Sequence, residues 1–238
     1  MPQLVFIHGP GAGACHESYA HQLAHFEGSI APDLPGHLEG APCASIERYT
    51  EWLRGWLWAQ GKKQDLVLVG FTLGACIALQ YALDYPDEVA GLALMTVAIR
   101  PKNRPANAYQ MRLDAANGGE AYEKWLEYQQ HALMFVESPL KEQLMERHKQ
   151  VGPLSQYRDL VAIDQFDVRD RIADLKAPLL LIRGNDDPTS PPQYEEEIME
   201  VVPHARLLRL DKAGHFPMAE RPADVNAAIE ELLRQTAS

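Results

Sequence analysis

Short apolar segments and longer amphipathic segments alternate along this chain of 238 residues. The apolar segments are rich in Val, Ile and Leu and are bounded by Gly, Pro or Asp, which is typical of strands buried on both faces. The segments between them, such as 46–57, 73–83 and 225–233, carry apolar residues at helical spacing. We therefore expect an α/β fold with a mostly parallel sheet flanked by helices. The predicted strands are 4–7, 29–31, 66–69, 91–95, 179–182 and 205–210, which gives a sheet of about six strands.

One long segment interrupts the alternation. Residues 101–164 contain several helix-like stretches but no strand-like run. We interpret this segment as a helical cap inserted into a core formed by residues 1–100 and 165–238. Because no long linker or low-complexity run flanks the insertion, we expect it to pack on the same domain as the core.

Composition and charge exclude several classes of function. With 22 Lys and Arg against 33 Asp and Glu, the net charge of −11 disfavours partners such as nucleic acid and anionic membrane surfaces. No apolar run is long enough to span a bilayer, and the first residues do not resemble a signal peptide. The three cysteines lack metal-ligand spacing and are too few for a disulfide framework. We expect a cytoplasmic protein without a metal ion or cofactor; its oligomeric state is not indicated.

The most informative segment is 66–76, in which an apolar strand passes through Gly70-Phe71-Thr72-Leu73-Gly74 directly into a helix. A turn this sharp favours glycine on both sides, because the flanking backbone passes too close for a side chain. Such a turn could serve packing alone. It also resembles the nucleophile elbow of the α/β-hydrolases, Gly-x-Ser-x-Gly, with Thr72 at the position of the serine.

Two later segments strengthen the resemblance to the α/β-hydrolases. Gly184-Asn185-Asp186-Asp187 follows one predicted strand, and Gly214-His215 follows the last one. In this family such positions supply the acid and the base of a catalytic triad, in the chain order nucleophile, acid, base. The resemblance assigns Asp187 as the acid, with Asp186 as the alternative one residue away, and His215 as the base. A histidine that only hydrogen-bonds within the core is the structural alternative for His215.

The resemblance also implies an oxyanion hole and a fold that lacks the family's first two strands. The segment His8-Gly9-Pro10-Gly11 is similar to the family's His-Gly loop, and further matches at 32–37 and 85–89 extend the likeness over nearly the whole chain outside 101–164. One oxyanion donor would be the N–H of Leu73. Pro10 has no N–H, so the second donor should come from Gly11. We expect Pro10, Phe71 and Trp125 to line the substrate pocket.

These residues lead to a specific hypothesis and two alternatives. The hypothesis is a hydrolase of carboxylic esters, or of thioesters, that acts on a small-molecule substrate through an acyl-enzyme on Thr72. The β-methyl group of Thr72 restricts χ1 and disfavours the strained backbone conformation of the elbow, so threonine is an unusual nucleophile at this position. One alternative is a catalytically silent binding protein of the same fold. The other is a lyase or C–C hydrolase in which His215 acts as a base and the hydroxyl only donates a hydrogen bond.

Overall fold

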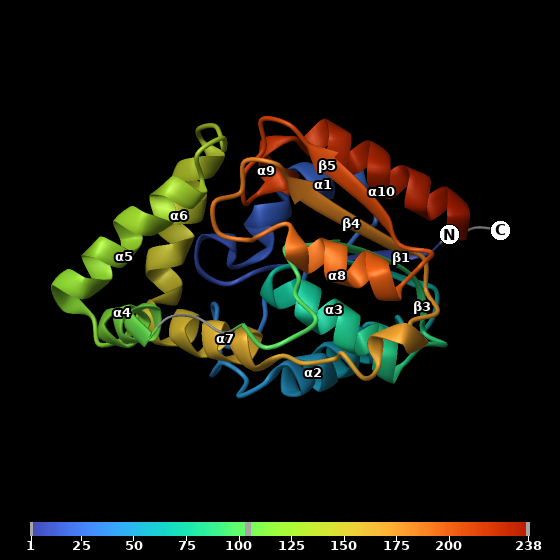
Figure 1. The fold of residues 1–238 in the computed structure, drawn as a ribbon, viewed down its shortest axis with the longest axis horizontal. Helices are drawn as coiled ribbons and strands as arrows, with labels where there is room; N and C mark the ends of the chain where they lie inside the picture. Colours follow the sequence, from blue (N-terminus) through green and yellow to red (C-terminus); the bar gives the residue numbers. More distant parts are fainter. Residues whose placement is uncertain (1, 103–105, 237–238) are drawn as a thin grey trace.

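The computed structural model describes residues 2–102 and 106–236 and contains one parallel sheet. Its spatial order follows the chain, from β1 through β5, and every neighbouring pair is parallel. Figure 1 shows the twisted sheet between layers of helices. The α/β fold class predicted from the sequence is therefore confirmed. The strands are β1 (Gln3–Ile7), β2 (Leu66–Phe71), β3 (Val89–Met95), β4 (Leu179–Gly184) and β5 (Arg206–Leu210).

Each face of the sheet has its own apolar layer, because successive strand side chains point to opposite sides. Leu68 and Leu94 belong to the layer that includes residues of α2, α3 and α8, whereas Val67 and Val69 belong to the layer that includes α10. Among the described residues, no helix has the length and apolar character needed to cross a membrane. The helices of the two layers are α1 (Ala20–His25), α2 (Ile46–Ala59), α3 (Leu73–Asp84), α8 (Gln193–Val201), α9 (Pro217–Glu220) and α10 (Pro222–Thr236). Short 3-10 turns are η1 (Gly11–Gly13), η2 (His16–Tyr19) and η3 (Ile172–Asp174).

The predicted strand 29–31 is not one of the five strands, so the expected count of about six needs correction. Ile30 forms a single parallel bridge with Val5. Its carbonyl accepts a hydrogen bond from the Phe6 N–H, and its own N–H donates to the Leu4 carbonyl. Pro32 follows two residues later and has no N–H, so the ladder cannot continue along the segment.

Within the described residues between β3 and β4, four α-helices occupy the segment predicted to form a cap, and the last of them ends one residue beyond it. Figure 1 shows them gathered beside one end of the sheet, whereas both chain termini lie at the opposite end. They are α4 (Ala106–Ala116), α5 (Gly119–Ala132), α6 (Leu140–Val151) and α7 (Pro153–Gln165). The division into a core and a cap stays a prediction.

A buried charged pair ties α7 to the loop that follows 29–31. His37 Nε2 donates to Asp159 Oδ2 at 2.9 Å, and Tyr49 donates its hydroxyl to Asp159 Oδ1 at 2.7 Å. His37 Nδ1 contacts the Leu34 carbonyl at 3.1 Å, so both ring nitrogens face acceptors. Burial lowers the pKa of His37, but the hydrogen bond and the charge of Asp159 outweigh it and raise the pKa overall. The pair therefore anchors α7 beside the sheet.

A second buried carboxyl holds the loop that precedes α9. Glu220 Oε2 accepts a hydrogen bond from the Gly214 N–H at 2.5 Å. Burial, with a further contribution from the charge of Asp187, raises the pKa of Glu220 to about 7. The charge state of Glu220 therefore changes near neutral pH, and its hydrogen-bond partner Gly214 directly precedes His215.

We predict that Asp159→Ala lowers the free energy of unfolding by about 3–5 kcal/mol, because it leaves His37 buried without its counter-charge. Tyr49→Phe removes one hydrogen bond from the same carboxylate and should cost only about 1 kcal/mol. Urea unfolding of the two variants and the wild type measures both values. Equal losses in the two variants would contradict the role of the charged pair.

We predict that Glu220 makes the protein less stable as the pH rises. The carboxyl has an ordinary pKa of 4.5 when unfolded and about 7 when folded, so the folded protein alone keeps the proton between these values. The resulting loss of stability is at most about 3 kcal/mol. Glu220→Gln keeps an acceptor for the Gly214 N–H and should abolish this contribution to the pH dependence of stability. Urea unfolding at pH 5 and pH 8 tests it, and an unchanged pH dependence in the variant would show that Glu220 is not its source.

Candidate active site

Thr72 occupies a strained turn between β2 and α3. Its φ of 46° and ψ of −101° lie in a region that β-branched residues rarely adopt. A Cβ at Gly74 would lie 1.9 Å from the Ile7 carbonyl oxygen, and one at Gly70 would lie 2.4 Å from the Gly74 oxygen. Only glycine allows the chain to pass this closely, so the turn needs both glycines. The Thr72 side chain is held where the strand ends and faces a cavity.

The structure brings Asp187 and His215 together although 28 residues separate them in the chain. His215 Nδ1 donates to Asp187 Oδ2 at 2.8 Å. Burial opposes ionisation of Asp187, but the charge and the hydrogen bond of His215 outweigh it and lower the pKa of the carboxyl. Asp186, the alternative acid, is exposed and makes no contact with His215 among the described interactions. The geometry thus selects Asp187 as the partner of the imidazole.

Thr189 joins this pair and was not foreseen from the sequence. Its hydroxyl lies 2.8 Å from Asp187 Oδ1 and 2.7 Å from His215 Nδ1. The Thr189 N–H also donates to Asp187 Oδ1 at 2.8 Å. These contacts assign the Nδ1–H tautomer, because Nδ1 faces only oxygen acceptors. Nε2 is then the basic nitrogen. The Asp-x-Thr spacing of a local side-chain turn was the signal in the sequence.

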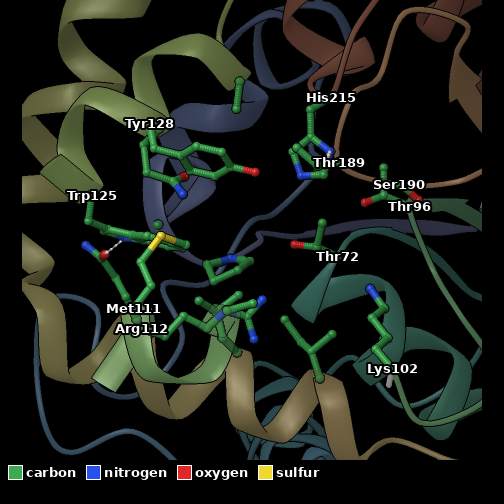
Figure 2. A pocket seen from close by; sticks show the side chains of 18 of the residues that line it. Thr72, Thr96, Lys102, Met111, Arg112, Trp125, Tyr128, Thr189, Ser190 and His215 are labelled. Atoms are coloured by element: carbon green, nitrogen blue, oxygen red, sulfur yellow. Dashed lines mark hydrogen bonds between the residues drawn. The ribbon is translucent and has the colours of Figure 1, made fainter. Parts of the chain in front are cut away.

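The Thr72 hydroxyl lies at the same cavity as His215 but makes no hydrogen bond with it among the described interactions. Thr72 and His215 both line the cavity, and Figure 2 shows the threonine beneath the imidazole. Thr72 Oγ1 is buried and has no partner among the described residues. It lies over the backbone of Gly9, where an added Cβ would come within 2.5 Å of it. Hydrogen bonds between nucleophile and base often tighten only when substrate is bound.

The two predicted oxyanion donors lie at two backbone turns. Leu73 is the first residue of α3, where backbone N–H groups have no partner within the helix. Pro10 and Gly11 both line the cavity, and Gly11 begins the turn η1 with a φ of +61°. The turn's own hydrogen bonds use the N–H groups of Gly9, Gly13 and Ala14. Gly11 therefore stays the candidate for the second donor.

His148 of α6 packs against the turn that carries Gly11. A Cβ on Gly11 would lie 3.2 Å from the His148 ring and 3.2 Å from Gln129 Oε1. Burial lowers the pKa of His148 to about 4, so its imidazole is neutral at physiological pH. Side chains of α5 and α6 thus lie against the backbone at Gly11.

A cavity of about 180 Å³ opens in front of Thr72 and His215. One side is apolar and aromatic and includes the predicted residue Trp125, whose indole N–H donates to Gln156 at 3.1 Å. Phe71, also predicted to line the pocket, is instead buried behind it. Its ring packs 5.1 Å from the His215 ring and 4.9 Å from the Phe216 ring, which leaves it no face toward the cavity.

Only one group of side chains within residues 2–102 and 106–236 has the spacing of metal ligands. Cys15, Glu17 and Asp33 place their ligand atoms within 4.8 Å of one another. Glu17 forms an ion pair with Arg147, and Asp33 accepts hydrogen bonds from the backbone and ring of His16. Both carboxylates thus have partners within the protein, and through Arg147 the group links η2 to α6.

Comparisons with known proteins identify the family. The model of the alpha/beta hydrolase family matches residues 4–228. A pimeloyl-(acyl-carrier protein) methyl ester esterase from Aromatoleum aromaticum is 26% identical over 98% of this chain and 98% of its own length. Lipase 1 from Psychrobacter immobilis is 24% identical over 91% of this chain and 72% of its own. A thermophilic esterase from Thermogutta terrifontis superposes with a TM-score of 0.87 at 23% identity, over 100% of this chain and 91% of its own. Because the family model spans nearly all of the sequence, this chain belongs to the alpha/beta hydrolase family.

Proposed function

We propose that the protein hydrolyses carboxylic esters, and thioesters by the same route, through an acyl-enzyme on Thr72. The observation that carries this proposal is that the Asp187–His215 pair and the hydroxyl of Thr72, on a strained turn, lie at the same cavity. A carboxylate that binds the imidazole and a hydroxyl within reach of the other ring nitrogen are the requirements of nucleophilic acyl transfer. The names of the esterase and lipase relatives support the same reaction.

The steps follow from the positions of the groups. His215 Nε2 takes the proton from Thr72 Oγ1 as the hydroxyl oxygen attacks the ester carbonyl carbon. Asp187 stabilises the resulting imidazolium, and the N–H groups of Leu73 and Gly11 bind the oxyanion. The alcohol leaves with the proton from His215, and water then attacks the acyl-enzyme with the same imidazole as base. No step requires a metal ion or an organic cofactor.

The helices α4 to α7 form the lid of this proposed enzyme. The lining of the cavity includes residues of α4, α5 and α7, so these helices shape the space that an acyl or alcohol group fills. His148 of α6 lies against the turn that carries Gly11. The three free cysteines suit a reducing compartment, which supports a cytoplasmic site of action.

A silent binding protein is the second candidate, and two observations favour it. The Thr72 hydroxyl has no hydrogen bond to His215 in the described structure. Pro10 also removes the N–H that the family's loop presents at that position. In other hydrolases the loss of one oxyanion donor costs about 2.7–4 kcal/mol of barrier. A lyase or C–C hydrolase that uses His215 as base is a third candidate, in which no acyl-enzyme forms.

We predict that Thr72→Ser keeps ester hydrolysis within about tenfold of wild type, which corresponds to about 1.4 kcal/mol of barrier. The reason is that a working pocket has already accommodated the methyl group of threonine. Thr72→Ala should abolish acyl-enzyme formation. Steady-state kinetics of the three proteins on one short-chain ester measures this. Activity that appears only in the serine variant would support the silent protein, and an active alanine variant would remove Thr72 from the mechanism.

We predict that His215→Ala and Asp187→Asn both depress kcat with little change in the free energy of unfolding. Losses in comparable triads reach about 10⁴-fold, and His215→Ala should be the more severe because the imidazole itself transfers the proton. Asp186→Asn is the matched control, since that side chain is exposed. A severe defect in Asp186→Asn together with a mild one in Asp187→Asn would contradict the assignment of the acid.

A further inference from the structure

We infer that the polar side of the cavity binds a carboxylate group of the substrate, so that the preferred ester carries a second, ionised carboxyl. The residues are Thr96, Lys102 and Ser190, which line the same cavity as Thr72. Figure 2 shows them on one side of Thr72, whereas Met111, Trp125 and Tyr128 lie on the other. This inference rests on the proposed function and names the substrate class for that site.

The first observation is two buried hydroxyls that the proposed mechanism does not use. Thr96 is 3% exposed and Ser190 is 5% exposed, and neither hydroxyl has a partner among the described residues. Buried polar atoms are nearly always hydrogen-bonded in folded proteins, so two such atoms in one cavity require an explanation. A ligand with oxygen acceptors supplies the missing partners.

The second observation is the backbone at Thr96. Its φ of 56° is positive, which is an outlier for a β-branched residue. It directly follows β3, and the preceding Met95 carbonyl accepts a hydrogen bond from the Thr72 N–H at 3.0 Å. This hydrogen bond connects the turn that carries Thr96 to the turn that carries Thr72. Strained conformations of this kind persist where the surrounding structure imposes them, as at binding sites.

Ser190 is held in place just as firmly. Its N–H donates to Asp187 Oδ1 at 3.3 Å, and its carbonyl accepts from the buried Arg183 guanidinium at 2.7 Å. Arg183 in turn contacts Glu195 at 3.2 Å. The backbone of Ser190 is therefore fixed by its neighbours on both sides, and its hydroxyl is left to face the cavity.

The charge of the lining selects an anion. Lys102 is 8% exposed, and its ammonium lies 5.2 Å from the centre of the Tyr194 ring. Arg112 lines the cavity as well and is paired with Asp164. None of the described lining residues is Asp or Glu, although the chain carries a net charge of −11. An ammonium and two hydroxyl donors that line one cavity match an ionised carboxylate better than a neutral chain.

The geometry also fixes where that carboxylate lies within the substrate. Thr96 follows β3 and Thr72 follows the adjacent β2, so the two side chains lie at neighbouring strand ends. The cavity of about 180 Å³ holds only a small molecule. The second carboxyl is therefore a few carbon atoms from the ester carbonyl, as in a monoester of a short dicarboxylic acid.

The test compares monomethyl glutarate with methyl glutaramate, which replaces the free carboxylate by a neutral amide of nearly the same shape. We expect the wild type to prefer the carboxylate by about tenfold or more in kcat/KM, the usual effect of a hydrogen bond to a charged group. Lys102→Met should reduce the preference to within about twofold, and Lys102→Arg should keep part of it because the charge is retained. Thr96→Val, which preserves shape without the hydroxyl, should weaken the preference several-fold.

Lys176→Met is the matched control, because this exposed lysine precedes β4 and does not line the cavity. It should leave the preference unchanged. An equal rate with both esters in the wild type, or an undiminished preference in Lys102→Met, would overturn the inference.

A binding measurement separates this inference from the proposed reaction. Calorimetric titration of Thr72→Ala with each ester reports affinity where no acyl-enzyme can form. Tighter binding of monomethyl glutarate than of methyl glutaramate, lost in the double variant with Lys102→Met, supports the carboxylate site even if the wild type hydrolyses neither ester. Equal affinities for the two esters would exclude the site whatever the wild type hydrolyses.

Discussion

The close contact of the turn at Thr72 with β1 is the constraint on which the rest of the site depends. Gly74 passes so near the Ile7 carbonyl that no side chain fits between them, and Gly70 is equally close to Gly74. This contact forces Thr72 into a strained backbone conformation, which costs about 1–3 kcal/mol at such positions. Burial of the flanking strand and helix offsets that cost, because β2 and most of α3 are buried. The same packing that imposes the strained backbone also fixes the position of the Thr72 hydroxyl.

The surroundings of Thr72 combine rigid groups from the sheet with groups from the inserted helices. Asp187, Thr189 and His215 come from loops that follow β4 and β5, and their mutual hydrogen bonds fix the imidazole. The turn that carries Gly11, by contrast, is bordered by His148 and Gln129 of the inserted helices. Because Gly11 is the proposed second oxyanion donor, the position of these helices bears on the proposed chemistry as well as on the shape of the pocket.

Much of the fold and of the candidate site could be predicted from the sequence because both depend on local patterns. Apolar runs predicted all five strands to within about two residues at each end, and the glycines around Thr72 indicated the turn. The apolar run at 29–31 led to a predicted sixth strand. The pattern of apolar residues does not show that Pro32, which has no N–H, ends the hydrogen bonding to β1. Phe71 was misplaced because its side of the strand depends on how β2 twists into the turn. Thr96, Lys102, Thr189 and Ser190 were missed because only the assembled sheet brings them to Thr72.

The central claim is that Thr72 forms the covalent intermediate. The most direct measurement is mass spectrometry of the protein after reaction with a fluorophosphonate, followed by peptide mapping of the labelled residue. The account predicts a single phosphonyl adduct on Thr72 that is absent from His215→Ala, because the imidazole must take the hydroxyl proton. A protein that stays unlabelled while it hydrolyses esters, or one labelled at another residue, would contradict it.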